Sequence, residues 1–147
     1  MHKNLFYITI FSIVVFSGCS PVAETVKTVW GSSTRALEDA RDEAIKKTYR
    51  CPYDECFDAV LSFARNEPSL TPTNPKFFDV FIKDRIKSHI IVTGIKGNVD
   101  TTEVGIFLTE KQKDVIELEI SSLSTTAKEK VAKAVFEELD HHFSSVN

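Results

Sequence analysis

The chain has 147 residues, a formal net charge of −3 at pH 7, and 42% hydrophobic residues. This length allows one domain with a real core, and the 11 phenylalanines indicate packing rather than disorder. A mildly acidic chain is a poor ligand for nucleic acids, so we expect no nucleic-acid partner.

The N-terminal segment has the pattern of a bacterial signal peptide. Positively charged residues lie at positions 2–3, an apolar run follows at 5–16, and the small residues Ser17 and Gly18 end it. A bilayer-spanning helix needs roughly 20 apolar residues, so this run is too short to span stably but suits a signal peptide. We therefore predict a signal peptide over residues 1–18.

The end of this segment, Phe16-Ser17-Gly18-Cys19, resembles the bacterial lipobox, although Phe16 departs from the usual Leu. The resemblance implies that Cys19 is diacylated on sulfur, becomes the N-terminus and anchors the protein in a membrane. Ser20 is not the Asp that retains lipoproteins at the inner membrane, which favours the periplasmic face of the outer membrane in a Gram-negative source. Two alternatives remain: an ordinary secretory signal with an incidental cysteine, and an anchor that is never cleaved.

Two cysteines remain beyond the proposed anchor, Cys51 and Cys56. In an oxidising envelope they can form a disulfide, and the alternative is that both are small buried hydrophobic residues. Their spacing is a weak zinc signal, because no second cysteine pair exists and no histidine is near. We expect no metal and no cofactor.

The region after the signal divides into three parts. Residues 19–30 form a tether, residues 31–48 a helical segment, and residues 49–147 an α+β domain. Apolar residues at helical spacing predict a helix from 34 to 47 in the helical segment, supported by i,i+4 pairs between Asp42 and Lys46 and between Glu43 and Lys47.

Strand-like alternation dominates the second half of the chain. A helix is predicted over 54–66, a short strand or extended link over 49–51, and a last helix from a Thr126–Glu129 capping box to about Phe143. Four strands are predicted between these helices, at 77–83, 89–95, 102–109 and 114–121. Short connectors require antiparallel neighbours. The expected fold is α+β, an antiparallel four-stranded meander covered on one face by two helices, with an extra N-terminal helix.

No catalytic constellation is present in the sequence. His141 and His142 are adjacent, so on a helix they point about 100° apart and do not face one metal. Glu117 and Glu119 share one face of a strand and could form an acidic patch. Lys83, Arg85 and Lys87 gather at one hairpin, where a charged turn is the simplest interpretation. We therefore expect a protein that is not an enzyme.

Three segments carry a resemblance to known proteins: 53–60, which opens a helix, the strand 115–120, and 130–133 in the last helix. On these patterns residues 53–143 resemble small bacterial lipoproteins of unknown function and, more distantly, the helix-grip domains of the accessory lipoprotein C of the outer-membrane β-barrel assembly machine. The resemblance implies a structural or interaction role in the envelope, with another envelope protein as partner, and transfers no catalytic residue.

A distinctive segment before the first helix is a candidate docking element for that partner. It consists of Trp30, Gly31, Ser32, Ser33, Thr34 and Arg35. The alternative function is a periplasmic carrier of a small ligand or lipid, which would bind between the sheet and a helix.

Overall fold

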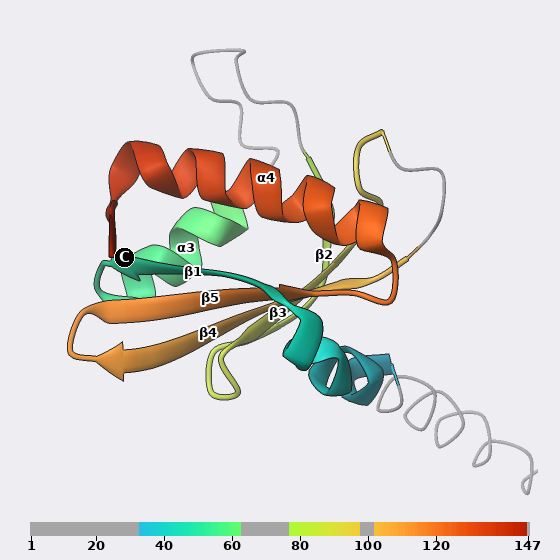
Figure 1. Cartoon of the computed structure of the whole chain (residues 1–147), viewed down its shortest axis with the longest axis horizontal. Helices are drawn as coiled ribbons and strands as arrows, with labels where there is room; N and C mark the ends of the chain where they lie inside the picture. The colour runs from blue at the N-terminus through green and yellow to red at the C-terminus, as the bar shows by residue number, and fades with distance from the viewer. Residues whose placement is uncertain (1–32, 63–76, 98–101, 147) are drawn as a thin grey trace, which may run out of the picture. The chain divides into compact units, whose positions relative to one another are not determined.

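The computed structural model describes residues 33–62, 77–97 and 102–146. The predicted signal peptide, Cys19 and the predicted tether lie outside these residues. The chain divides into two units, Met1–Arg35 and Ala36–Asn147, and the second contains every strand of the sheet (Figure 1).

The fold is α+β and is built on one antiparallel sheet of six strands (Figure 1). Residues 33–39 are helical and lead into the 3-10 turn η1. The elements in chain order are η1 (Ala40–Glu43), β1 (Ile45–Arg50), α3 (Tyr53–Ser62), β2 (Asp79–Asp84), β3 (His89–Thr93), β4 (Val104–Gln112), β5 (Val115–Ser121), α4 (Thr125–His142) and β6 (Ser144–Val146). The strand order is β2-β3-β4-β5-β1-β6. The four predicted strands are consecutive neighbours, but the predicted strand count was too low because β1 and β6 extend the sheet.

The helix predicted from 34 to 47 ends early, and its last residues are a strand. Ile45 and Tyr49 contact the main core, while Lys46 lies on the other side of the strand, so the period is two rather than 3.6. Ile45–Arg50 pairs with β5 along its whole length. Lys47 donates to Asp140 of α4 at 2.6 Å, so the long-range pairing of β1 replaces the expected helical ion pairs.

The C-terminal elements also differ in detail from the prediction. Helix α4 begins at Thr125, because Ser124 is its N-cap and the Ser124 hydroxyl accepts from the Ala127 N–H at 3.3 Å. The prediction of Thr126 as the N-cap of a capping box is therefore wrong, because the N-cap lies two residues earlier. After α4, the three exposed residues of β6 pair with the end of β1.

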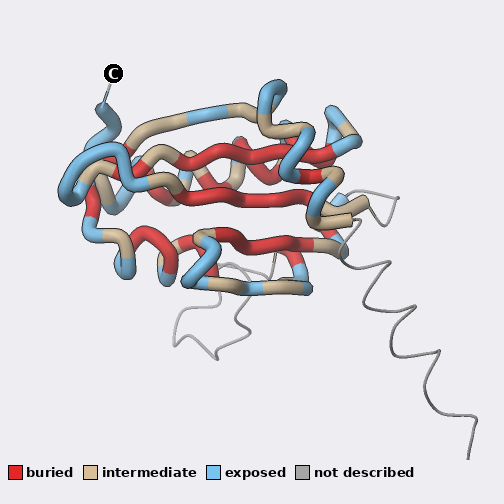
Figure 2. The backbone as a smooth tube through the Cα atoms, turned by 90° about the horizontal axis from the view of Figure 1, so that it is seen from below, coloured by how far each residue is buried: buried red, intermediate tan, exposed pale blue. Residues whose placement is uncertain are grey.

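Helices α3 and α4 cover one face of the sheet, called here the inner face, and enclose the main core (Figure 1). Figure 2 shows the central strands buried and the connections between them exposed. Side chains alternate between the two faces along β5, and Ile116, Leu118 and Ile120 point inward. Because the period is two, residues 117 and 119 lie on the opposite, outer face.

Residues 36–43, which we call the strap, lie over the outer face. A second, smaller hydrophobic cluster is buried there. Leu37 of the strap is buried against Ile91 and Phe107, with Ile82 at the margin. Ser121 also donates its hydroxyl to the Leu37 carbonyl at 2.7 Å. The N-terminal helical segment therefore packs on the face of the sheet opposite α3 and α4.

Gly105 makes room for the Phe107 ring on the outer face. A Cβ at Gly105 would lie 2.6 Å from Phe107 Cε2, closer than side-chain carbons approach. We expect Gly105→Ala to push the ring out of its place and to lower the free energy of unfolding by about 1 to 2 kcal/mol. Urea unfolding followed by circular dichroism measures the change, and an unchanged midpoint would show that Phe107 yields without cost.

Candidate functional site

The strap is fastened to the sheet by an ion cluster around Glu119. Arg41 donates to Glu119 Oε2 from Nε at 2.6 Å and also from Nη2. Lys46 donates to Oε1 at 2.5 Å. Only 7% of the Glu119 side chain is exposed. Each of its two carboxylate oxygens accepts a hydrogen bond from a cationic side chain.

Arg41 makes two further contacts. Its Cζ lies 4.7 Å from the centroid of the Phe107 ring, within cation–π range. Its Nη2 also donates to the Thr109 hydroxyl at 3.3 Å. A single side chain of the strap thus makes both the aromatic and the ionic contacts of the outer face. At the end of the strap, Lys128 of α4 donates to the Glu43 carbonyl at 2.7 Å.

Electrostatics favour the charged form of Glu119. Burial acts to raise its pKa, but the hydrogen bonds from Lys46 and Arg41 outweigh burial and hold the pKa below its ordinary value. On the same face, burial lowers the pKa of His89, whose ring lies edge-on to Phe107 with centroids 6.0 Å apart. The side chains beneath the strap therefore favour an ionised glutamate and a neutral histidine.

Removing the charge of Glu119 should loosen the strap. We expect Glu119→Gln to lower the free energy of unfolding at pH 7 by about 1 kcal/mol, a modest value because Arg41 and Lys46 are partly exposed and screened. Chemical denaturation at pH 7 measures the loss. The reverse result, a variant as stable as the wild type, would mean that the cluster contributes nothing to stability.

The pH dependence of this loss follows from the direction of the pKa shift. A carboxyl whose folded pKa lies below its unfolded pKa of about 4.3 stabilises the protein above that pH and loses its contribution as the pH falls through the folded pKa. The stability difference between wild type and Glu119→Gln should therefore be full at pH 7 and shrink below about pH 4. A difference that is constant down to pH 3 would contradict this assignment.

Glu117 and Glu119, which on sequence could form an acidic patch, are both paired with basic side chains. Lys111 donates to Glu117 at 2.7 Å, and the Glu117 side chain is 20% exposed while that of Lys111 is 50% exposed. Each carboxylate lies low in the sheet beneath a longer basic side chain. In both pairs the basic side chain is therefore the more exposed partner, which the alternation of the strand alone did not reveal.

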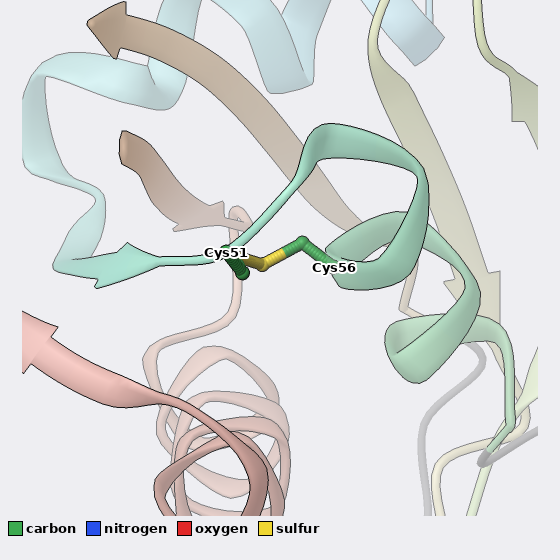
Figure 3. Close-up of a disulfide and its surroundings, with 2 residues drawn as sticks. All are labelled: Cys51 and Cys56. Atoms are coloured by element: carbon green, nitrogen blue, oxygen red, sulfur yellow. A yellow bond between two sulfur atoms is a disulfide. The ribbon is translucent and has the colours of Figure 1, made fainter. Parts of the chain in front are cut away.

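Cys51 and Cys56 form a disulfide between the end of β1 and the first turns of α3 (Figure 3). Their Cα atoms are 6.0 Å apart, and both residues are buried in the main core. The Cys51 N–H also donates to the Asp114 carbonyl at 2.9 Å. The bond therefore closes the turn that leads the chain from the sheet into its covering helix.

A shallow groove of about 560 Å³ lies between α3 and the end of α4. Its lining residues are Asp54, Glu55, Asp58, Ala59, Ser62, His142 and Phe143. Arg85 of the β2–β3 hairpin binds Asp54 at 2.7 Å and Asp58 at 2.6 Å, and its Cζ lies 4.5 Å from the Phe57 ring centroid. His142 contacts Glu138 at 3.1 Å. In the described ranges no group of three or more His, Cys, Asp or Glu residues is arranged to hold a metal ion.

The structure places only part of the predicted docking element. Of this element, the structure describes Ser33, Thr34 and Arg35, which are helical, whereas Trp30, Gly31 and Ser32 lie outside the described residues. The lipidation residue Cys19 lies outside them as well. No pattern in the sequence singles out Arg41 or Phe107. Arg41 reads as an exposed helix residue, and only the distant partner Glu119 reveals its role.

Comparison of the chain with protein-family models, curated proteins and solved structures finds no match. Across the residues that the structure describes, no helix has both the length and the apolar character needed to cross a bilayer.

Proposed function

We propose that this is a lipid-anchored protein of the bacterial envelope that acts as a non-catalytic interaction or structural module. The observation that carries the proposal is Cys19, directly after an apolar run and Ser17-Gly18. The acyl chains on Cys19 would hold the domain at a membrane, in a Gram-negative source at the periplasmic face of the outer membrane. Each buried methylene contributes about 0.8 kcal/mol, so two or more chains anchor stably.

The Cys51–Cys56 disulfide supports export to an oxidising compartment. Disulfides are rare in cytosolic proteins and persist in the periplasm and outside the cell. This one is buried between β1 and α3, where it forms part of the core. A structural bond of this kind agrees with a protein that folds after secretion.

The arrangement of charged groups favours a binding role over catalysis. Glu119 is saturated by Arg41 and Lys46, and Arg85 binds both Asp54 and Asp58. A general acid or base needs a carboxyl with access to a substrate and a pKa near the working pH. The partner we propose is another envelope protein rather than a nucleic acid, and no metal or cofactor is required.

The distant resemblance to helix-grip domains belongs to the same proposal. Its support is the arrangement of one long helix, α4, across an antiparallel sheet. The alternative role as a carrier of a small ligand or lipid has less support, because core side chains fill the space between the inner face and the helices.

The proposal is tested by the intact mass of the protein extracted from membranes. We expect the mass of residues 19–147 plus acyl chains, and we expect Cys19→Ser to leave an unprocessed or unacylated chain. A matched variant, Ser20→Ala, should be acylated normally. A wild-type mass without acyl chains would overturn the anchor and the proposed location together.

A further inference from the structure

The outer face of the sheet has a step. The strap lies over the start of β4 and the end of β5, where Leu37 contacts Phe107 and Arg41 contacts Glu119. Figure 1 shows the strap, in blue and teal, toward the end of the sheet opposite the β4–β5 hairpin. We call the hairpin side of this face the open half. Its outward residues include Thr48, Arg50, Lys111, Val115 and Glu117.

The strap presents negative charge to solvent. Its outward residues are all acidic and all exposed: Glu38, Asp39, Asp42 and Glu43. Its basic residue, Arg41, turns inward to Glu119. The raised half of the outer face is therefore a ridge of carboxylates about one helix diameter, roughly 10 Å, above the sheet.

The open half presents the opposite charge. Arg50 is exposed, and the side chains of Lys46, at its border, and Lys111 are 44% and 50% exposed. The carboxylates paired with the two lysines are less exposed: Glu117, bound by Lys111, is 20% exposed and Glu119, bound by Lys46, is 7% exposed. The most exposed of the outward charged side chains in the open half are therefore basic, in a chain whose net charge is negative.

From this step we infer that the outer face is a self-complementary docking surface for a second copy of the chain. A two-fold axis along the border between the strap and the open half would place each strap on the open half of the other copy. Such an isologous contact uses the same patch twice. It brings the acidic ridge of each copy onto the basic residues of the other copy's open half. The raised strap then meets the lower half of the face, and opposite charges meet.

Docking between two copies does not require the lipid anchor. The contact would form between two copies in solution as well as on a membrane. Anchoring both copies in one membrane would raise their effective concentration and strengthen a contact that is weak in solution. Like charges meet if the axis is shifted so that strap meets strap, so the charges also select one register.

The first test is zero-length carbodiimide crosslinking of the membrane-extracted wild-type chain, using a mixture of unlabelled and ¹⁵N-labelled protein. We expect mixed-isotope crosslinks between strap carboxylates, such as Asp42 and Glu43, and Lys46 or Lys111. Two results would overturn the inference. One is that no crosslink joins a labelled chain to an unlabelled chain, and the other is that such mixed crosslinks involve only Lys130 and Lys133 of α4.

The second test is a charge swap followed by analytical ultracentrifugation. Arg50→Glu alone and Asp42→Arg alone should each weaken self-association by about tenfold or more, because an attractive contact becomes repulsive. Combining both substitutions in one chain should restore it. Lys133→Glu, an equal charge change on α4, should leave it unchanged. A wild type that is monomeric at all concentrations, a dimer that tolerates Arg50→Glu, or a combined variant without recovery would each overturn the proposed surface.

Discussion

Replacing Cys51 and Cys56 together by alanine should lower the free energy of unfolding by about 3 kcal/mol. The bond closes a short loop, and the chain-entropy relation gives about 2 kcal/mol for a loop of this size. The remainder comes from packing, because both sulfurs lie in the main core and alanine leaves part of that space empty. Alanine is the suitable replacement, since serine would bury a hydroxyl that needs a partner.

Urea unfolding of the oxidised wild type and the double variant measures this difference. A further expectation is kinetic: because both cysteines are buried, reductant should open the bond only when the protein unfolds locally. Thiol labelling in reductant should therefore accelerate when urea is added. Equal stability of the two proteins, or fast reduction of the native protein, would contradict a structural role for the bond.

The regular strands were predictable because their pattern is local. Alternation of Ile116, Leu118 and Ile120 with charged residues determines which face of β5 is buried, and the structure has that face against α4 and α3. Short connectors then order β2 to β5 as a meander. These features need no information from distant parts of the chain.

The region around β1 was not predictable in the same way. Lys46 and Lys47 have acidic residues four positions earlier, which favours a helix, but their partners are Glu119 and Asp140, more than 70 residues away. The pairing of β1 with β5 outweighs weak helical ion pairs of about 0.3 to 0.5 kcal/mol. Strand β6 has only three exposed residues and no alternation to detect.

The candidate site shows the same limit. The cysteines and the acidic residues of β5 were identified from their spacing, but the cations that cover those acids come from β1, β4 and the strap. A pattern along one strand predicts which side chains share a face, not what lies on that face. The self-complementary step of the outer face therefore emerges only from the tertiary structure.

Phe107→Ala should destabilise the protein by about 3 kcal/mol and release the strap. The ring is buried beneath Leu37, lies under the Arg41 guanidinium and fills the space above Gly105. Its loss removes the apolar support of the strap, and the ion cluster alone, being partly exposed, is too weak to hold it. We therefore expect amide hydrogen exchange in the strap to accelerate well beyond the change in global stability.

Leu108→Ala is the matched control, because Leu108 is the next residue of β4, is equally buried and points into the main core instead. It should lower global stability by a similar amount, about 3 kcal/mol, without selective exchange in the strap. Exchange measured under native conditions distinguishes the two, since local opening of the strap precedes global unfolding only when Phe107 is lost. If both variants accelerate strap exchange equally, the strap unfolds with the main core and Phe107 has no separate role in holding it. In that case the ridge proposed for self-association would persist as long as the fold does.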